Sequence, residues 1–357
     1  MKYSLVSLFS GAGGLDLGFH NVGFHIEWAN EFDKSITPTL RLNFPGTEVD
    51  DRSLADVPSW QIPSGIGVIG GPPCQAWSEA GAGRGLGDKR GQIFLEYIRV
   101  INDKKPLFFL AENVSGMLSI RHKESLDFIF KEFNKLGYHF TYRLLNAHDY
   151  GVPEDRKRIF FIGYHKKLGK KFTFPEEFPD SKKKYLKDAI WDLRNSAKPA
   201  GIKNRTNGNK LEVANHEYLH GGFSTIYMSR NRVRSWDEPS FTIQAGGRHA
   251  PIHPQAPKMK FIEQNKRIFV PGKEKQYRRL SVRECARVQT FPDDFKFVYD
   301  YVSDGYKMIG NAVPVKFAEV IAQQIKKDLD SYFSNGGTFE IVKHQPLPKQ
   351  ENLLVTV

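Results

Sequence analysis

The chain has 357 residues, 40% apolar and 26% charged, a composition that is typical of a folded globular protein and excludes a disordered or fibrous one. Its length exceeds the roughly 250 residues that one compact core usually reaches, so we expect two domains. The formal net charge of +12 indicates a polyanionic partner, while two cysteines exclude a disulfide framework or a cysteine-rich zinc site and favour a reducing compartment.

The apolar start of the chain, residues 3–9, is too short for a secretory signal and runs directly into a glycine-rich turn and Asp16. No run of about 18 apolar residues follows, so the sequence predicts no membrane-spanning segment. We therefore expect a basic cytoplasmic protein.

Short apolar runs alternate with helical stretches through the first 165 residues. Strands are predicted over 4–9, 67–69, 107–110 and 158–163, and helices over 15–19, 93–101 and 125–136. This alternation indicates an α/β fold with a doubly wound, mostly parallel sheet. In such sheets the functional residues lie just beyond the carboxyl ends of the strands.

The pattern changes near residue 166, where lysine clusters, prolines and turn residues replace the periodic runs. We expect a catalytic and cofactor-binding domain over 1–165 and a smaller, irregular target-recognition domain over 166–275. Residues 276–334 would form a hinge and a segment that returns to the catalytic domain, and 335–357 a loose tail.

Two helices are predicted in the returning segment. Ser281 is a suitable N-cap for the first, over 281–289, and Glu284 would complete a capping box. The second opens at Pro314, and its apolar side chains recur every four residues from Phe317 to Leu329, which predicts one face packed on the catalytic domain.

Cys74 follows two prolines at a predicted strand end, where backbone amides can stabilise a thiolate. A cysteine is more often a buried small hydrophobe, but these flanks are not apolar core. The glycine-rich segment that follows carries Arg84 and Arg90, which is typical of a mobile lid that closes on a phosphate backbone. Cys285, inside a predicted helix, is expected to be structural.

The Phe-Ser-Gly-Ala-Gly-Gly turn at 9–14 lets a ligand approach the backbone after the first strand. The dinucleotide-binding fingerprint would need glycine where Asp16 stands, which disfavours a nicotinamide cofactor. Glu31 lies far enough along the chain to reach ribose hydroxyls.

Six motifs in this order resemble the ordered motif set of the DNA cytosine 5-methyltransferases. They are the turn at 9–14, Gly-Pro-Pro-Cys-Gln at 71–75, Glu-Asn-Val at 112–114, Arg-Lys-Arg at 156–158, and the stretches 279–287 and 305–314. Residues 224–236 also resemble the bacterial HaeIII-type enzymes, which recognise GGCC and methylate its internal cytosine. The resemblance implies the fold already expected, with DNA as the substrate.

The resemblance also implies a covalent route. The thiolate of Cys74 would add to carbon 6 of cytosine, while Glu112 holds or protonates ring nitrogen 3 and Arg158 contacts the ring carbonyl. Carbon 5 would take the methyl group of S-adenosylmethionine, after which a base removes its proton and the thiolate leaves. A carboxyl at a strand end suits such proton sharing. Because carbon 5 is unreachable inside a stacked duplex, the cytosine must flip out.

A cofactor pocket for S-adenosylmethionine, with no metal, is implied as well. The residues expected in it are Phe9, Gly11, Gly13, Gly14, Glu31, Phe32, Asp51, Pro73, Asn311 and Ala312. Glu31 would take the ribose hydroxyls, Phe32 would lie against the adenine, and Asp51 would accept from the adenine amino group. Spacing favours Asp51 over the adjacent Asp50.

The expected partner is double-stranded DNA with one flipped cytosine. The residues expected to contact it are Gln75, Ser78, Arg84, Arg90, Arg156, Arg230, Arg232 and Arg248. Arg230, Arg232 and Arg234 alternate, so in an extended segment they project from one face, and arginine pairs bidentately with guanine. We expect Arg230 and Arg232 to read bases, and Arg234 to contact phosphate or to be structural.

Three alternatives share part of this pattern. A related enzyme acting on transfer RNA would share the chemistry, but the residues after Cys74 and the arginine segment disfavour it. A catalytically inactive DNA-binding relative is disfavoured by intact Cys74, Glu112 and Arg158, and a nicotinamide oxidoreductase by Asp16. The sequence therefore predicts a monomeric methyltransferase of a restriction-modification system.

Overall fold

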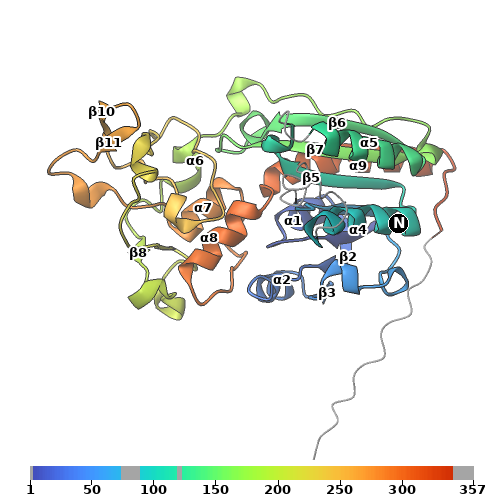
Figure 1. Ribbon diagram of the computed structural model, residues 1–357, viewed down its shortest axis with the longest axis horizontal. Coiled ribbons are helices and arrows are strands. Elements are labelled where there is room, and N and C mark those ends of the chain that lie inside the picture. The colour runs from blue at the N-terminus through green and yellow to red at the C-terminus, as the bar shows by residue number, and fades with distance from the viewer. Residues whose placement is uncertain (1–2, 74–88, 119–122, 341–357) are drawn as a thin grey trace, which may run out of the picture.

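The computed structural model describes residues 3–73, 89–118 and 123–340, and its catalytic domain is built on one twisted sheet (Figure 1). Within these residues seven strands pair in the order β3-β2-β1-β4-β5-β7-β6. The strands are β1 (Tyr3–Leu8), β2 (Phe24–Asn30), β3 (Glu48–Asp50), β4 (Gly67–Gly70), β5 (Phe108–Val114), β6 (Tyr138–Asn146) and β7 (Lys157–His165). The first five are mutually parallel, whereas β7 runs antiparallel to β5 and β6. The predicted doubly wound, mostly parallel α/β fold is confirmed.

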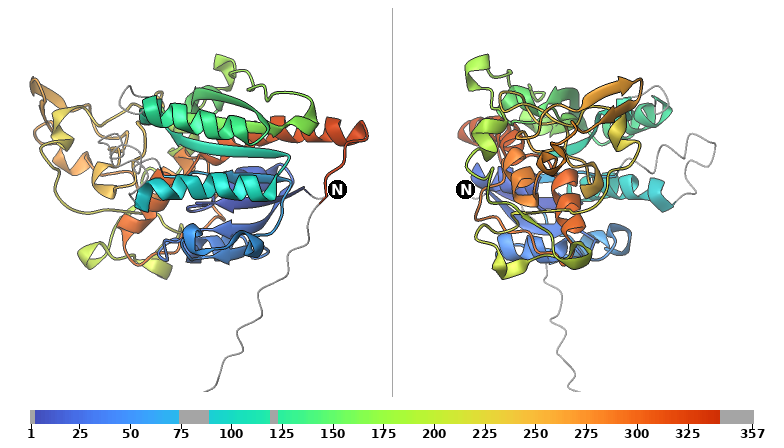
Figure 2. Two further views of the ribbon diagram at one scale, coloured as in Figure 1. Left: turned by 45° about the vertical axis from the view of Figure 1, so that its right-hand side comes forward. Right: turned by 90° about the vertical axis from the view of Figure 1, so that its left-hand side faces the viewer.

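Helices cover both faces of the sheet (Figure 2). They are α1 (Gly14–Asn21), α4 (Lys89–Lys104), α5 (Lys123–Lys135) and α9 (Val315–Ser334). Helix α2 (Thr37–Asn43) instead buries Leu40 in a separate core, together with Leu280 and Phe295 from later in the chain. Because successive strand residues point to opposite faces, Leu5 of β1 packs in the core beneath α1 and α9, and Val6 in the core beneath α4 and α5. The strands are therefore apolar on both sides, as parallel strands covered by helices must be.

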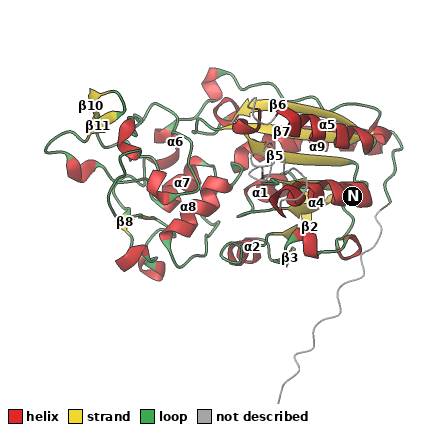
Figure 3. Cartoon of the chain, in the orientation of Figure 1, coloured by secondary structure: helices red, strands yellow, loops and turns green. Residues whose placement is uncertain are grey.

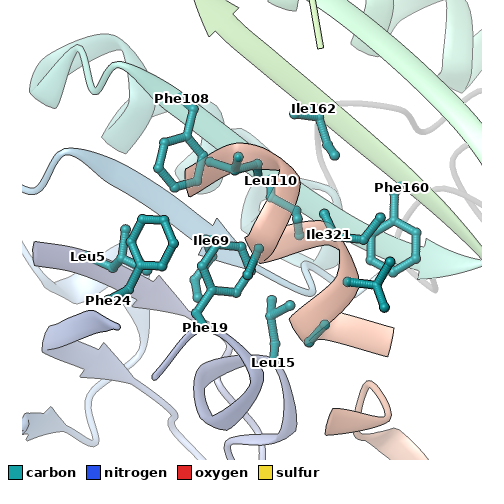
Figure 4. Packing of buried hydrophobic residues seen from close by; sticks show 14 of the residues in the cluster. Leu5, Leu15, Phe19, Phe24, Ile69, Phe108, Leu110, Phe160, Ile162 and Ile321 are labelled. Carbon is teal, nitrogen blue, oxygen red and sulfur yellow. The ribbon is translucent and has the colours of Figure 1, made fainter. Parts of the chain in front are cut away.

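Helix α9 begins after Pro314 and buries the predicted apolar face from Phe317 to Leu329. Ile321 lies against Phe160 and Leu110 on the same side of the sheet as Leu15 (Figure 4). This packing brings the C-terminal segment back onto the catalytic domain, as predicted.

The smaller domain is irregular, with long loops between short elements (Figure 3). Its elements are α6 (Leu186–Ile190), β8 (Lys198–Pro199), β9 (Glu217–Tyr218), β10 (Lys260–Glu263), β11 (Lys266–Ile268), α7 (Val282–Val288) and α8 (Val302–Asn311), with 3₁₀ turns between them. The predicted capping box at α7 is confirmed, because the Ser281 hydroxyl accepts from the Glu284 amide and the Glu284 carboxylate accepts from the Ser281 amide.

The stretch that follows β7 stays with the catalytic domain. Leu168 and Phe172 belong to the core beneath α1 and α9, and Phe178 packs against it. We therefore propose that the smaller domain starts after Phe178 rather than at residue 166. Within the described ranges, no helix is long and apolar enough to cross a membrane.

Candidate active site

A cavity of about 460 Å³ opens at the carboxyl ends of β1, β4 and β5. From β1 the chain winds outward to β2 and β3, and from β4 it winds the other way to β5, so the cavity lies where the strand order reverses. Ligands bind at such switch points in open α/β sheets. Its wall includes the predicted residues Phe9, Gly11, Glu31, Phe32, Pro73, Glu112, Arg158, Asn311 and Ala312.

Glu112 and Arg158 form a nearly buried ion pair in this cavity. They come from the adjacent antiparallel strands β5 and β7, and Arg158 Nε lies 2.8 Å from Glu112 Oε1. Burial raises the pKa of Glu112, and the neighbouring Arg158 and Arg156 oppose this effect. A raised pKa favours the protonated form, which is the form that can share a proton with a ring nitrogen. The structure thus brings together the two described members of the predicted catalytic set.

The third member, Cys74, lies outside the described residues, as do Gln75, Ser78 and Arg84. Arg90 belongs to α4, but its side chain also lies outside what the structure describes. The chain just before Cys74 is held firmly, because the side-chain amide of Asn113 donates to the Pro72 carbonyl at 2.8 Å. Asn113 thereby ties the end of β5 to the Pro72–Pro73 turn beside Glu112.

Glu31 joins the glycine turn to the segment after β2. One carboxylate oxygen accepts from the Gly11 amide and the other from the Asp33 amide, both at 2.9 Å. Phe32 beside it is 64% exposed, which leaves an aromatic face at the cavity wall. Phe9 adopts a left-handed backbone with φ of 55°, a strained conformation that clusters at binding sites.

An ion pair between Lys307 of α8 and Asp33 also lies at the cavity wall. It joins the C-terminal motif to the segment after β2. The sequence reasoning named neither residue as a site residue, although Lys307 lies inside the motif at 305–314.

Three residues predicted for the cofactor pocket are not brought to the cavity wall. Gly13 and Gly14 serve close packing instead, because an added Cβ would lie 2.5 Å from the Phe44 ring at Gly13 and 2.3 Å from the Val313 carbonyl oxygen at Gly14. The Asp51 carboxylate pairs with Arg41 at 3.1 Å. These three positions therefore lie outside the described wall of this cavity, and their contact with a cofactor stays a prediction.

The prediction that Arg156 contacts DNA is corrected by its burial. Its side chain has 0% exposure, and its guanidinium donates to the carbonyls of Ile243 at 3.0 Å, Gly310 at 2.7 Å and Ala312 at 2.8 Å. Glu154, equally buried, pairs with it at 3.5 Å. A guanidinium enclosed in this way cannot reach a phosphate. Its planar fork instead joins three segments that are distant in sequence.

The arginines of the smaller domain differ from one another. Arg230 and Arg248 are exposed, and Arg230 has an extended backbone. Arg232 is half-buried over the Tyr227 ring, with Nε donating to the Tyr227 carbonyl at 2.9 Å. Arg234 pairs with Asp155 at 2.9 Å. This contact fits the structural role expected for Arg234 as the alternative to a phosphate contact.

Comparison with known proteins identifies the class to which this fold and site belong. The family model of the C-5 cytosine-specific DNA methylases matches residues 3–327. The chain is 54% identical over 326 residues to Type II methyltransferase M.FnuDI of Fusobacterium nucleatum, covering 91% of this chain and 94% of the relative. It is also 54% identical over 330 residues to Type II methyltransferase M.MthTI of Methanothermobacter thermautotrophicus, covering 92% and 99%.

Solved structures show the same fold at low sequence identity. A crystal structure of a mutant DNMT2 from Spodoptera frugiperda superposes with a TM-score of 0.65 at 17% identity, covering 92% of this chain and 100% of the other. Together with the family match, these relatives show that the chain belongs to the C-5 cytosine-specific DNA methylase family. It is a DNA cytosine-5 methyltransferase, as the sequence motifs predicted.

Proposed function

We propose that this enzyme methylates carbon 5 of the internal cytosine of GGCC in double-stranded DNA, as the modification enzyme of a type II restriction-modification system. The observation that carries the proposal is the buried Glu112–Arg158 pair in the cavity, next to the turn that leads into Cys74. The target sequence is supported by the resemblance of residues 224–236 to GGCC enzymes.

In the proposed mechanism, the Cys74 thiolate adds to carbon 6 of a flipped cytosine, and Glu112 shares its proton with ring nitrogen 3. This proton sharing stabilises the electron pair that moves toward carbon 5. Arg158 keeps one oxygen of Glu112 engaged through Nε. Its remaining donors are suited to the ring carbonyl oxygen. After methylation a base takes the proton from carbon 5, and the thiolate leaves carbon 6.

The residues of the cavity fit S-adenosylmethionine, which supplies an electrophilic methyl group when it is bound. Glu31 keeps free lone pairs for ribose hydroxyls although its two oxygens already accept backbone amides. Phe32 offers an exposed ring for an adenine. The aromatic ring and the carboxylate are consecutive, so one nucleoside can contact both.

The surface of the smaller domain supports a DNA partner. Arg230 and Arg248 are exposed, and the chain as a whole carries a net charge of +12. Such charges neutralise phosphates, while an arginine in the major groove can read guanine. We propose that one chain acts on one flipped cytosine, as a cytoplasmic monomer associated with the nucleoid.

The decisive experiment is transfer of labelled methyl groups from S-adenosylmethionine to plasmid DNA, followed by mapping of the modified cytosines. We expect labelling at the internal cytosine of GGCC, and none with Cys74→Ala. Labelling at another sequence would overturn the target assignment. Transfer to transfer RNA in a parallel reaction, with none to DNA, would favour the transfer RNA alternative and overturn the proposal.

A further inference from the structure

Asp16 is a buried carboxylate that the proposed mechanism does not use. It lies in the first turn of α1, is 1% exposed and belongs to the wall of the cavity. Among the described residues, neither of its carboxylate oxygens has a hydrogen-bond partner. Burial raises its pKa to about 6, whereas the nearby Ser7 hydroxyl and the backbone amide of Asp16 itself act in the opposite direction. The ionised form is therefore favoured at neutral pH.

The other carboxylates of the cavity wall are already compensated. Glu112 pairs with Arg158, and Asp33 pairs with Lys307.

Glu31 accepts two backbone amides, so Asp16 is the carboxylate of the described wall that has neither an ion pair nor a hydrogen bond of normal geometry. The described wall holds four carboxylates and two cations, so its balance is negative. A buried charge without a partner is costly, and a cationic ligand would remove that cost.

We propose that Asp16 accepts hydrogen bonds from the α-ammonium group of S-adenosylmethionine. This inference rests on the proposed function, because it assigns one contact of the same cofactor. The sulfonium carries a positive charge but no N–H group, and so it cannot satisfy two unpartnered carboxylate oxygens. An ammonium has three donors and a charge that matches.

The position of Asp16 in the cavity agrees with this assignment. Asp16 lies in the first turn of α1, directly after the glycine turn at 9–14. The Gly11 amide of that turn donates to Glu31, the expected ribose contact, so one short turn connects Asp16 to the ribose side of the cavity. The same residue that breaks the dinucleotide fingerprint would disfavour an anionic pyrophosphate and favour a cationic amino-acid tail.

The test compares the binding of two ligands by calorimetry. One is S-adenosylhomocysteine, which has the ammonium but no sulfonium, and the other is its deaminated analogue, in which hydrogen replaces the amino group. Asp16→Asn should weaken binding of S-adenosylhomocysteine about tenfold to a hundredfold, as expected when a charged hydrogen bond is lost. The deaminated analogue should bind both proteins within about threefold. Asp56→Asn, an exposed carboxylate of the same domain, is the matched control and should change neither affinity.

Two results would overturn the inference. Equal losses for both ligands would mean that Asp16 supports the fold, and an unchanged affinity for S-adenosylhomocysteine would mean that Asp16 makes no contact with the ammonium group.

If Asp16→Asn does not fold, the affinities of the wild-type protein for the two ligands still test the inference. The inference requires the deaminated analogue to bind the wild-type protein at least tenfold more weakly than S-adenosylhomocysteine does. Failure of the proposed function appears separately, as wild-type protein that transfers no methyl group to DNA.

Discussion

Replacing Arg156 by methionine removes the guanidinium that joins β7, the smaller domain and the C-terminal motif. The carbonyls of Ile243, Gly310 and Ala312 lose their donors, and Glu154 keeps a buried charge without its cation. Breaking a buried pair by removing one partner costs about 3–5 kcal/mol. A typical domain is stable by about 5–15 kcal/mol, so this loss should be plain in urea unfolding at pH 7.5.

The adjacent Lys157 provides the matched control, since it is exposed and lines another, more open cavity together with Arg158 and Gln244. Lys157→Ala should change stability by less than about 0.5 kcal/mol. If Lys157 contacts a phosphate, its loss should lower the salt slope of DNA binding by about one unit, whereas Arg156→Met should leave that slope unchanged. An Arg156→Met protein with wild-type stability and a lower slope would refute the interpretation of Arg156 as a buried connector.

Four further outcomes are expected. Cys74→Ala should abolish methyl transfer while leaving DNA binding largely intact, and more than a few percent residual turnover would contradict this expectation. With DNA that carries 5-fluorocytosine at the target, the wild-type protein should form a covalent complex and the variant should not. Arg90→Ala should weaken binding to all sequences and lower the salt slope by about one unit, and an unchanged slope would mean a solvated side chain. Arg230→Ala or Arg232→Ala should cost about 1–3 kcal/mol on GGCC and much less on single-base variants, and a uniform loss in competition assays at fixed salt would assign the residue to the backbone. Burial lowers the pKa of His253 to about 4, whereas a histidine of the unfolded chain has a pKa of about 6.5. As the pH falls from 7.5 to 5, the unfolded state therefore binds a proton that the folded state does not bind, and the folded state becomes less stable. The unfolding free energy of the wild type should fall by about 2 kcal/mol more than that of His253→Gln over this range, and equal losses would contradict this.

Elements of the fold could be predicted where apolar residues recur with a regular period along the sequence. The face from Phe317 to Leu329 is a regular four-residue repeat, and its helix was found with its N-terminal boundary. Strand β6 was not predicted, because its partly exposed residues lack a clear alternation. Nor could the antiparallel insertion of β7 between β5 and β6 be predicted, since register depends on contacts between distant segments.

Site residues that lie in short sequence motifs could be predicted, whereas the roles of residues that depend on burial could not. Glu112 and Arg158 were found through short motifs, and the structure pairs them. The interpretation of Arg156 failed because its acceptors lie 87 to 156 residues away, at Ile243 and Ala312 among others. Spacing alone favours Asp51 over Asp50 for the adenine contact, and this stays a prediction; the pairing of Asp51 with Arg41 from α2 depends on a tertiary contact that spacing does not show.

The way in which the cavity is assembled links its wall to the smaller domain. The Gly310 carbonyl accepts from Arg156, and Gly310 also packs so closely on the smaller domain that an added Cβ would lie 2.3 Å from the Ala245 amide. The same residue lines the cavity together with Asn311. The backbone at Gly310 and Asn311 thus lines the cavity on one side and packs against the smaller domain on the other. Because packed interiors transmit displacement rather than absorb it, a shift of the smaller domain would also move the cavity wall at Gly310.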